Sequence, residues 1–180
     1  MKETLSDEVL TKMHAPPKPD YPNFEPAQME EFDAFLFGIP TRYGNMPAQL
    51  KTFWDATGQI WQKGTLDGKY AGTFVSCSSA GGGTEMTALN MMSTFVHHGL
   101  IYVPLGYKNT FAQISSNSEV RGGSAWGAGT FAVGHIAMGN LTFLLTISQG
   151  DGSRQPTPLE MELAEIQGKT FWEKVSRVNF

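Results

Sequence analysis

The sequence predicts an α/β fold in which helices cover a parallel sheet. Three runs have the length and apolar composition of strands in such a sheet, namely 32–39, 69–78 and 99–107. Three other segments repeat apolar residues at helical spacing, namely 47–57, 85–98 and 158–178. Strands that alternate with helices pair in parallel, and the loops at their carboxyl ends form the binding crevice. Function is therefore expected on those loops.

The first strand and the helix after it are the clearest elements. The run "FDAFLFGI" is nearly all apolar, which predicts a strand buried on both faces. In the following helix, Leu50, Phe53 and Trp54 recur at helical spacing. Pro47 lies near the first turn, where its missing N–H costs nothing. The turn between the two elements, "PTRYGNM", is a candidate binding loop.

The second strand leads through the glycine loop "SAGGGT" into the second helix. This helix places Met86, Leu89, Met92 or Ser93, and Val96 on one stripe, whose simplest interpretation is core packing. Gly99 follows the helix and can adopt the left-handed conformation of a C-cap. The third strand then begins, so the strand and helix order repeats along one domain.

Composition favours one globular domain over residues 1–180, with 41% hydrophobic and 12% aromatic residues. A net charge of -4 without a basic stripe argues against nucleic-acid binding. The single cysteine, Cys77, and the polar first residues predict a cytoplasmic protein without a signal peptide. Residues 1–31 start as a polar helix and continue as a proline-rich, extended connection.

Two classes of function find no support in the spacing of residues. The most apolar stretch, 133–148, is too short to span a membrane and is broken by Gly134, Gly139 and Asn140. Metal spacing is also absent, because the neighbouring His97 and His98 would point to different faces of a helix. Neither candidate loop carries a nucleophile with a base, so the chemistry is expected to come from a bound cofactor.

Each candidate residue also has a purely structural interpretation. A run of three glycines is most often a flexible turn, and a histidine pair at the end of a helix often only interacts with the helix dipole. Trp61 alone is more often a core or interface residue, and Arg42 can pair with a surface carboxylate. Cys77 is more often a small buried hydrophobe than a reactive thiol.

Five stretches carry a resemblance to a known family, in this order along most of the chain: "PTRYGNMPAQLKTFWD", "GGGTE", "HHGLIYVPLGY", "RGGSAWGAGT" and "GDGSRQPT". Here the sequence resembles the WrbA-type NAD(P)H:quinone oxidoreductases, flavodoxin-like FMN proteins whose fungal members include minor allergens. The resemblance implies a flavodoxin-like three-layer α/β/α fold with FMN as cofactor and NAD(P)H as co-substrate. It also implies a two-electron, ping-pong reduction of a quinone by a homo-oligomer, which is a tetramer in the family.

The resemblance further implies which residues contact the flavin and the substrate. Two loops supply the flavin contacts, namely Pro40, Thr41, Arg42, Tyr43 and Gly44 from the first, and Cys77, Ser78, Ser79, Ala80, Gly81 and Gly82 from the glycine loop. His97 matches the family histidine near the flavin ring, and Trp61 matches the aromatic residue at the substrate site. No residue is assigned as catalytic, and no metal is expected.

The sequence also departs from the family pattern. Flavodoxin-like sheets order their strands 2-1-3-4-5, and "ETLSDEVLTKM" resembles the family segment after the second strand. The first two strands and the phosphate-binding loop are therefore expected to be missing, and 133–149 is an insertion between two motif halves. This leaves an alternative function open, a non-catalytic truncated form that only associates with intact subunits. Without the missing strands as neighbours, the strand at 32–39 is expected to be an apolar edge strand prone to aggregation.

Overall fold

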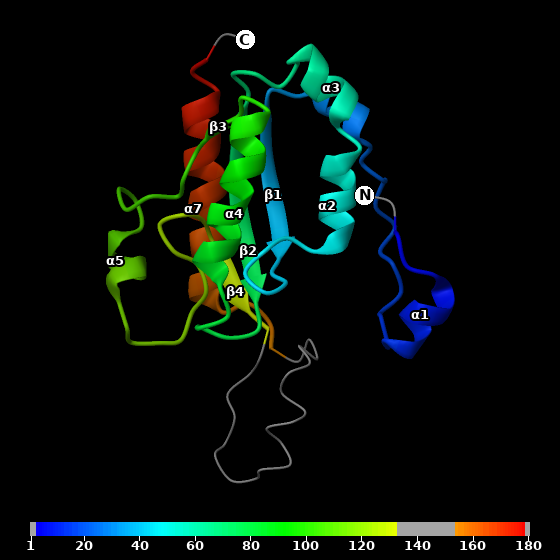
Figure 1. The fold of residues 1–180 in the computed structure, drawn as a ribbon. Coiled ribbons are helices and arrows are strands. Elements are labelled where there is room, and N and C mark those ends of the chain that lie inside the picture. Colours follow the sequence, from blue (N-terminus) through cyan, green and yellow to red (C-terminus); the bar gives the residue numbers. More distant parts are fainter. Residues whose placement is uncertain (1–2, 133–153, 179–180) are drawn as a thin grey trace.

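The computed structural model describes residues 3–132 and 154–178, and the predicted insertion at 133–149 lies outside them. Its centre is a parallel sheet of β1 (Ala34–Pro40), β2 (Tyr70–Cys77), β3 (Ile101–Tyr102) and β4 (Gly129–Phe131), seen nearly edge-on in Figure 1. β2 is the central strand, since it pairs with β1 along its whole length and with β3 and β4 at its two ends. The parallel α/β prediction is thus confirmed.

One face of the sheet packs on α2 (Ala48–Asp55), α3 (Gly58–Lys63) and α4 (Thr84–His97). This face holds the largest core cluster, to which the strands contribute Phe35, Ile39, Ala71 and Val75, and the helices Leu50, Phe53, Trp54, Ile60, Ala88, Met91 and Phe95. Pro47, predicted near the first turn, is the N-cap of α2. The apolar residues that the spacing in 47–57 predicts for the core therefore lie in the core.

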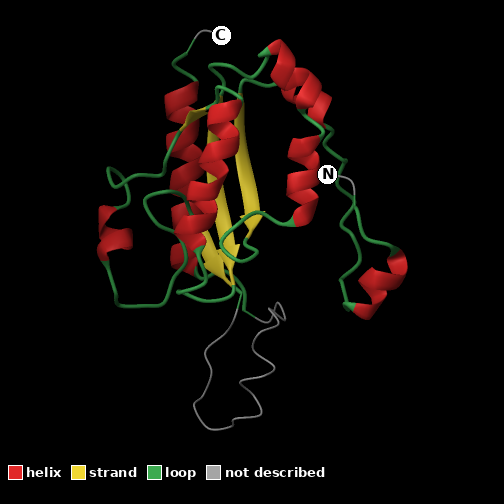
Figure 2. Ribbon diagram, in the orientation of Figure 1, coloured by secondary structure: helices red, strands yellow, loops and turns green. Residues whose placement is uncertain are grey.

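The opposite face packs on α7 (Pro158–Val175), as the arrangement of helices and strands in Figure 2 shows. Phe171 and Val175 of α7 join Val103 in one small core cluster, and Leu163 joins Leu105 and Ala128 in another. The helix begins with a capping box, in which Thr157 and Glu160 exchange side-chain to backbone hydrogen bonds. Helices thus cover both faces of the sheet.

The remaining elements are short. α1 (Asp7–Lys12) and the 3-10 helix η1 (Pro26–Glu31) flank the proline-rich connection, which has no regular structure between them. Lys69 stabilises the C-terminal end of η1. Its Nζ donates to the carbonyl oxygens of Met29, Glu30 and Phe32 at 3.3, 3.0 and 2.8 Å. α5 (Phe111–Ser115) lies in the long connection before β4. α1 and the connection lie where the sequence predicts a polar helix start and an extended segment.

Three details of the sequence prediction are wrong. β1 is not buried on both faces, because Leu36 and Gly38 are exposed on the side of α7. The third strand is reduced to the two residues of β3. The predicted core stripe of α4 faces solvent at Met86, Leu89 and Val96, while the buried residues of that helix are Thr87, Ala88, Met91 and Phe95. Apolar spacing alone does not distinguish a core stripe from an exposed one.

Candidate functional site

The loops after β1 and β2 lie side by side at the carboxyl edge of the sheet. In the first loop, Arg42 and Asn45 form an antiparallel bridge, with N···O distances of 2.7 and 2.9 Å. The tight turn between them puts Tyr43 at a φ of 54°, rare for a residue with a side chain, and leaves its side chain fully exposed. Asn90 of α4 donates from Nδ2 to the carbonyl of Gly44 at 2.7 Å, which ties this turn to the helix.

The glycine loop is packed so closely that Gly82 has no room for a side chain and Gly83 has little. A Cβ on Gly82 would lie 2.1 Å from the sulfur of Cys77, which is itself buried. A Cβ on Gly83 would lie 3.0 Å from the Cα of Gly44, so the two candidate loops touch through their backbones. The structure therefore brings together the residues predicted in 40–44 and 77–82.

The first turn of α4 is open toward this edge. Its N-cap is Gly83, which has no side chain to cap the helix, so the free N–H groups and the positive end of the dipole remain available. Within the described part of the chain, the buried hydroxyl oxygen of Thr84 has no hydrogen-bond partner. Uncapped amides and an orphan hydroxyl suit an electron-rich, planar ligand that accepts hydrogen bonds, such as the pyrimidine edge of a flavin.

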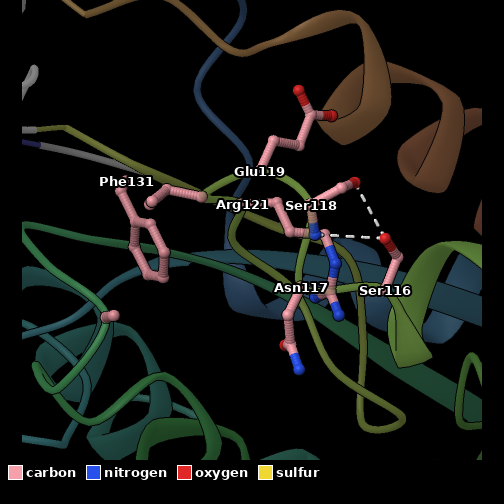
Figure 3. Close-up of a pocket in the computed structure, with 8 residues that line it drawn as sticks. Ser116, Asn117, Ser118, Glu119, Arg121 and Phe131 are labelled. Atoms are coloured by element: carbon pink, nitrogen blue, oxygen red, sulfur yellow. Dashed lines mark hydrogen bonds between the residues drawn. The ribbon is translucent and has the colours of Figure 1, made fainter.

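Two cavities adjoin the glycine loop. One, of about 380 Å³, lies against the start of α4 and is lined on its other side by Arg121, Gly123, Ser124 and Phe131. A second, of about 550 Å³, lies between Ala80 and the loop 116–121. Figure 3 shows this second cavity, with Phe131 on one side and Ser116, Ser118 and Arg121 on the other. Arg121 and Phe131 line both cavities, so they form a common wall opposite the glycine loop.

His97 and Trp61 lie elsewhere, at the amino edge of the sheet. The Trp61 indole N–H donates to the carbonyl of His97 at 2.8 Å, and both side chains are exposed. Because α4 spans residues 84–97 at 1.5 Å per residue, they lie about 20 Å from the glycine loop. The structure thus divides the predicted residues into two groups, at opposite ends of α4, within one chain.

His98, the neighbour of His97, is buried, whereas His97 is exposed. The two side chains thus point to different faces of the helix, as their adjacent positions predict. The Nε2 of His98 lies 3.0 Å from the hydroxyl of Thr57, which donates its own proton to the carbonyl of Trp54 at 2.6 Å. Nε2 therefore carries the proton, and Nδ1 is buried without a partner among the described residues. Burial lowers the pKa of His98 below its ordinary value of 6.5, and the charge of neighbouring His97 lowers it further.

This histidine makes stability depend on pH. Below pH 6.5 the unfolded chain binds a proton that folded His98 resists, so the free energy of unfolding falls as the pH drops from 6.5 toward 5. His98→Gln removes this slope, because glutamine does not titrate. Urea unfolding at pH 7.5, 6.5, 5.5 and 5 measures it for both proteins, with His14→Gln, at an exposed histidine, as the control that keeps the slope. Equal slopes in wild type and His98→Gln would contradict the assignment.

Sequence reasoning missed several residues of this region. Thr87 lies beneath the first loop, where its hydroxyl contacts that of Thr41 and also donates to the carbonyl of Gly83 at 2.9 Å. Asn90 and Thr84 were likewise not predicted. Within a helix, nothing in the spacing marks a threonine or asparagine that faces a neighbouring loop. Arg154, half-buried, forms an ion pair with buried Glu160, and only the "TPLE" capping-box pattern in the sequence points to Glu160.

The fold, the two adjoining loops and the cavities define a flavodoxin-like α/β protein. A family model described as NADPH-dependent FMN reductase matches residues 5–111, more than half of the 180 residues. The chain belongs to this family. Figure 1 shows that the matched part includes β1, β2, α4 and the loops of the site.

Curated relatives agree with this family. The minor allergen Alt a 7 of Alternaria alternata is 56% identical over 179 residues, which cover 98% of this chain and 80% of the allergen. The NAD(P)H quinone oxidoreductase PST3 of Candida albicans is 54% identical over 175 residues, covering 97% of this chain and 80% of that protein.

A solved structure agrees with the fold. It is the flavodoxin, WrbA-like protein of Agrobacterium tumefaciens, with a TM-score of 0.58 at 19% identity, covering 85% of this chain and 72% of that one. The predicted resemblance to flavodoxin-like, WrbA-type proteins and their fungal allergen members is confirmed. In the described residues, no helix is long and apolar enough to cross a membrane.

Proposed function

We propose that the chain is an FMN-dependent NAD(P)H:quinone oxidoreductase that reduces quinones by two-electron, ping-pong transfer. The observation that carries the proposal is the packing of the two loops, 40–44 and 77–83, against each other at the carboxyl edge of the sheet. This is where ligands bind in open α/β sheets. The named activity of relatives more than 50% identical supports it.

The flavin ring would lie against these two loops. Backbone amides of the glycine loop and the first turn of α4, with the Thr84 hydroxyl, would hydrogen-bond its polar edge, and Tyr43 would cover it from solvent. When bound, FMN supplies the capacity to accept a hydride and pass two electrons on. The protein's own contribution is to orient the ring and to favour the negative charge at its pyrimidine edge. We also propose that the protein acts in the cytoplasm, as the single cysteine and the polar first residues predict.

A second copy of the chain would complete the site. The exposed stripe of α4, Met86, Leu89, Ser93 and Val96, carries no charged side chain, and Glu85 at one end is the only acidic residue of the helix. Two such helices can pack antiparallel about a two-fold axis without bringing like charges together. That arrangement places His97 and Trp61 of one copy near the glycine loop of the other. The two groups of predicted residues would then form one site.

A specific observation favours the alternative of a non-catalytic form. The outer edge of β1 has no partner strand among the described residues. Beside it, an apolar groove of about 430 Å³ runs between β1, β2 and α7, and Phe74 at its floor is 46% exposed. An unpaired edge of this kind is a site for strand addition. In the alternative, intact subunits bind there, and the chain alone holds no flavin. The absence of the first two strands stays a prediction.

An assay with purified chain tests the proposal. With added FMN, we expect NAD(P)H oxidation that depends on a quinone such as benzoquinone, with parallel double-reciprocal lines when both substrates are varied. A chain that binds no FMN and has no quinone-dependent activity, yet co-purifies with an intact homologue, would support the non-catalytic form instead.

A further inference from the structure

A buried carboxylate joins the start of α7 to the wall of both cavities. The side chain of Glu160 is 1% exposed. Its Oε1 accepts from the backbone N–H of Gly122 at 2.7 Å, and its Oε2 accepts from the hydroxyl of Thr130 at 2.9 Å and the N–H of Thr157 at 2.9 Å. One carboxylate therefore connects the loop before β4, β4 itself and the N-cap of α7.

Arg154 pairs with this carboxylate in a fork. Its Nη1 lies 2.9 Å from Oε2 of Glu160, and its Nη2 lies 3.0 Å from Oε1. Nη1 also donates to the hydroxyl of Thr130 at 3.1 Å and to the carbonyl of Phe131 at 2.5 Å. Two-point pairing fixes the direction of the side chains as well as their distance. The pair therefore fixes the position of Phe131 from its backbone.

The pair bonds the chain at or next to the cavity wall at two places. Gly122 follows Arg121, and Thr130 precedes Phe131, and these neighbours line both cavities. Phe131 is also the partner of Cys77 in the sheet, and the next amide, of Ala132, donates to the carbonyl of Cys77 at 2.7 Å. The same backbone segment thus connects the pair to the base of the glycine loop.

The loop around Gly122 has little freedom to adapt if the hydrogen bonds of Glu160 and Arg154 are lost. A Cβ on Gly122 would lie 2.5 Å from the backbone carbon of Gly129, so the two backbones are already in close contact. Burying a carboxylate against an arginine in this way gains little net stability, and removing one partner leaves the other buried and unpaired. Such a costly pair is therefore best explained by the geometry that it imposes.

We propose that Glu160 and Arg154 are positioning residues that hold the wall formed by Arg121 and Phe131 at the distance from the glycine loop that the ligand requires. Neither side chain contacts the flavin in this account, which rests on the proposed function for the identity of the ligand. The hold on the loop itself does not depend on that function.

The test compares Glu160→Gln with Thr130→Val, which loses fewer of the bonds, and with Val175→Ala at the far end of α7. Val175 is buried and remote from the site, so its variant controls for a general loss of stability. Hydrogen exchange of the Gly122 amide and of 120–131 reports the wall directly, and flavin fluorescence reports FMN affinity.

For Glu160→Gln, we expect exchange at 120–131 about tenfold faster than in Val175→Ala and an FMN dissociation constant raised about tenfold. Thr130→Val falls between them. Equal exchange in Glu160→Gln and Val175→Ala would overturn the proposal. If the wild-type chain binds FMN, an equal FMN affinity in Glu160→Gln would also overturn it. If the wild-type chain binds no FMN but exchange at 120–131 is selectively faster, the proposed function fails while the positioning role stands.

Discussion

Gly82→Ala is expected to weaken FMN binding by about 10- to 100-fold, since overpacking of this kind costs about 1–3 kcal/mol. The added Cβ would lie 2.1 Å from the sulfur of Cys77 and 3.0 Å from the carbonyl oxygen of Ser79. The sulfur cannot easily move, because Cys77 is buried and its thiol donates to the carbonyl of Ser79 at 3.3 Å. The glycine loop must therefore shift, and its amides no longer face the ligand.

A second substitution separates this clash from a general defect. Cys77→Ala removes the sulfur, so the double variant Cys77→Ala with Gly82→Ala is expected to regain most of the lost affinity. Gly81→Ala is the matched control, because a Cβ there meets nothing within 4 Å. Flavin fluorescence quenching measures the FMN affinity of wild type, Gly82→Ala, the double variant and Gly81→Ala. If Gly82→Ala binds FMN as tightly as Gly81→Ala does, the glycine loop does not hold the flavin.

At FMN concentrations that saturate wild type but not Gly82→Ala, mixing two impaired variants is expected to restore about one quarter of wild-type activity, if two-fold dimers form at random. Gly82→Ala disables the glycine-loop end of a site, and Trp61→Ala disables the other end. In a mixed dimer one site carries both defects and the other carries neither, because each site takes its loop from one copy and Trp61 from its partner. Quinone reduction by separately purified, co-refolded variants measures this recovery.

The control pairs Gly82→Ala with Tyr43→Ala, two changes at the same end of α4, and no activity should return. An independent readout is a disulfide across the two-fold axis. Ser93→Cys, in a Cys77→Ser background, should form a covalent dimer on oxidation, whereas Glu165→Cys on the exposed face of α7 should not. Failure of both the recovery and the cross-link would show that α4 does not join two copies.

The sequence predicts the sheet and its helices well because their signals are local. Continuous apolar runs mark β1 and β2, and the spacing of Leu50, Phe53 and Trp54 places α2 on the core. The stripe on α4 misleads, because Met86, Leu89 and Val96 are as apolar as a core stripe but face away from the sheet. Which side of a helix faces the core depends on how the helix packs, and spacing alone does not contain that information.

The candidate site is predicted only in part. The two loops follow strands, so their meeting at one edge of the sheet follows from the parallel topology. The separation of His97 and Trp61 from these loops does not follow from the topology. A motif in the sequence does not show at which end of a helix the ligand lies. The Arg154–Glu160 pair connects segments more than 20 residues apart, Thr130 and Glu160 among them, and no local pattern marks such a contact.

An FMN titration of the purified chain, followed by quenching of flavin fluorescence, shows whether the two loops hold FMN. We expect saturable binding of one FMN per chain, which Gly82→Ala weakens and Gly81→Ala does not. No quenching at FMN concentrations well above those of the protein would contradict it and would favour the non-catalytic form.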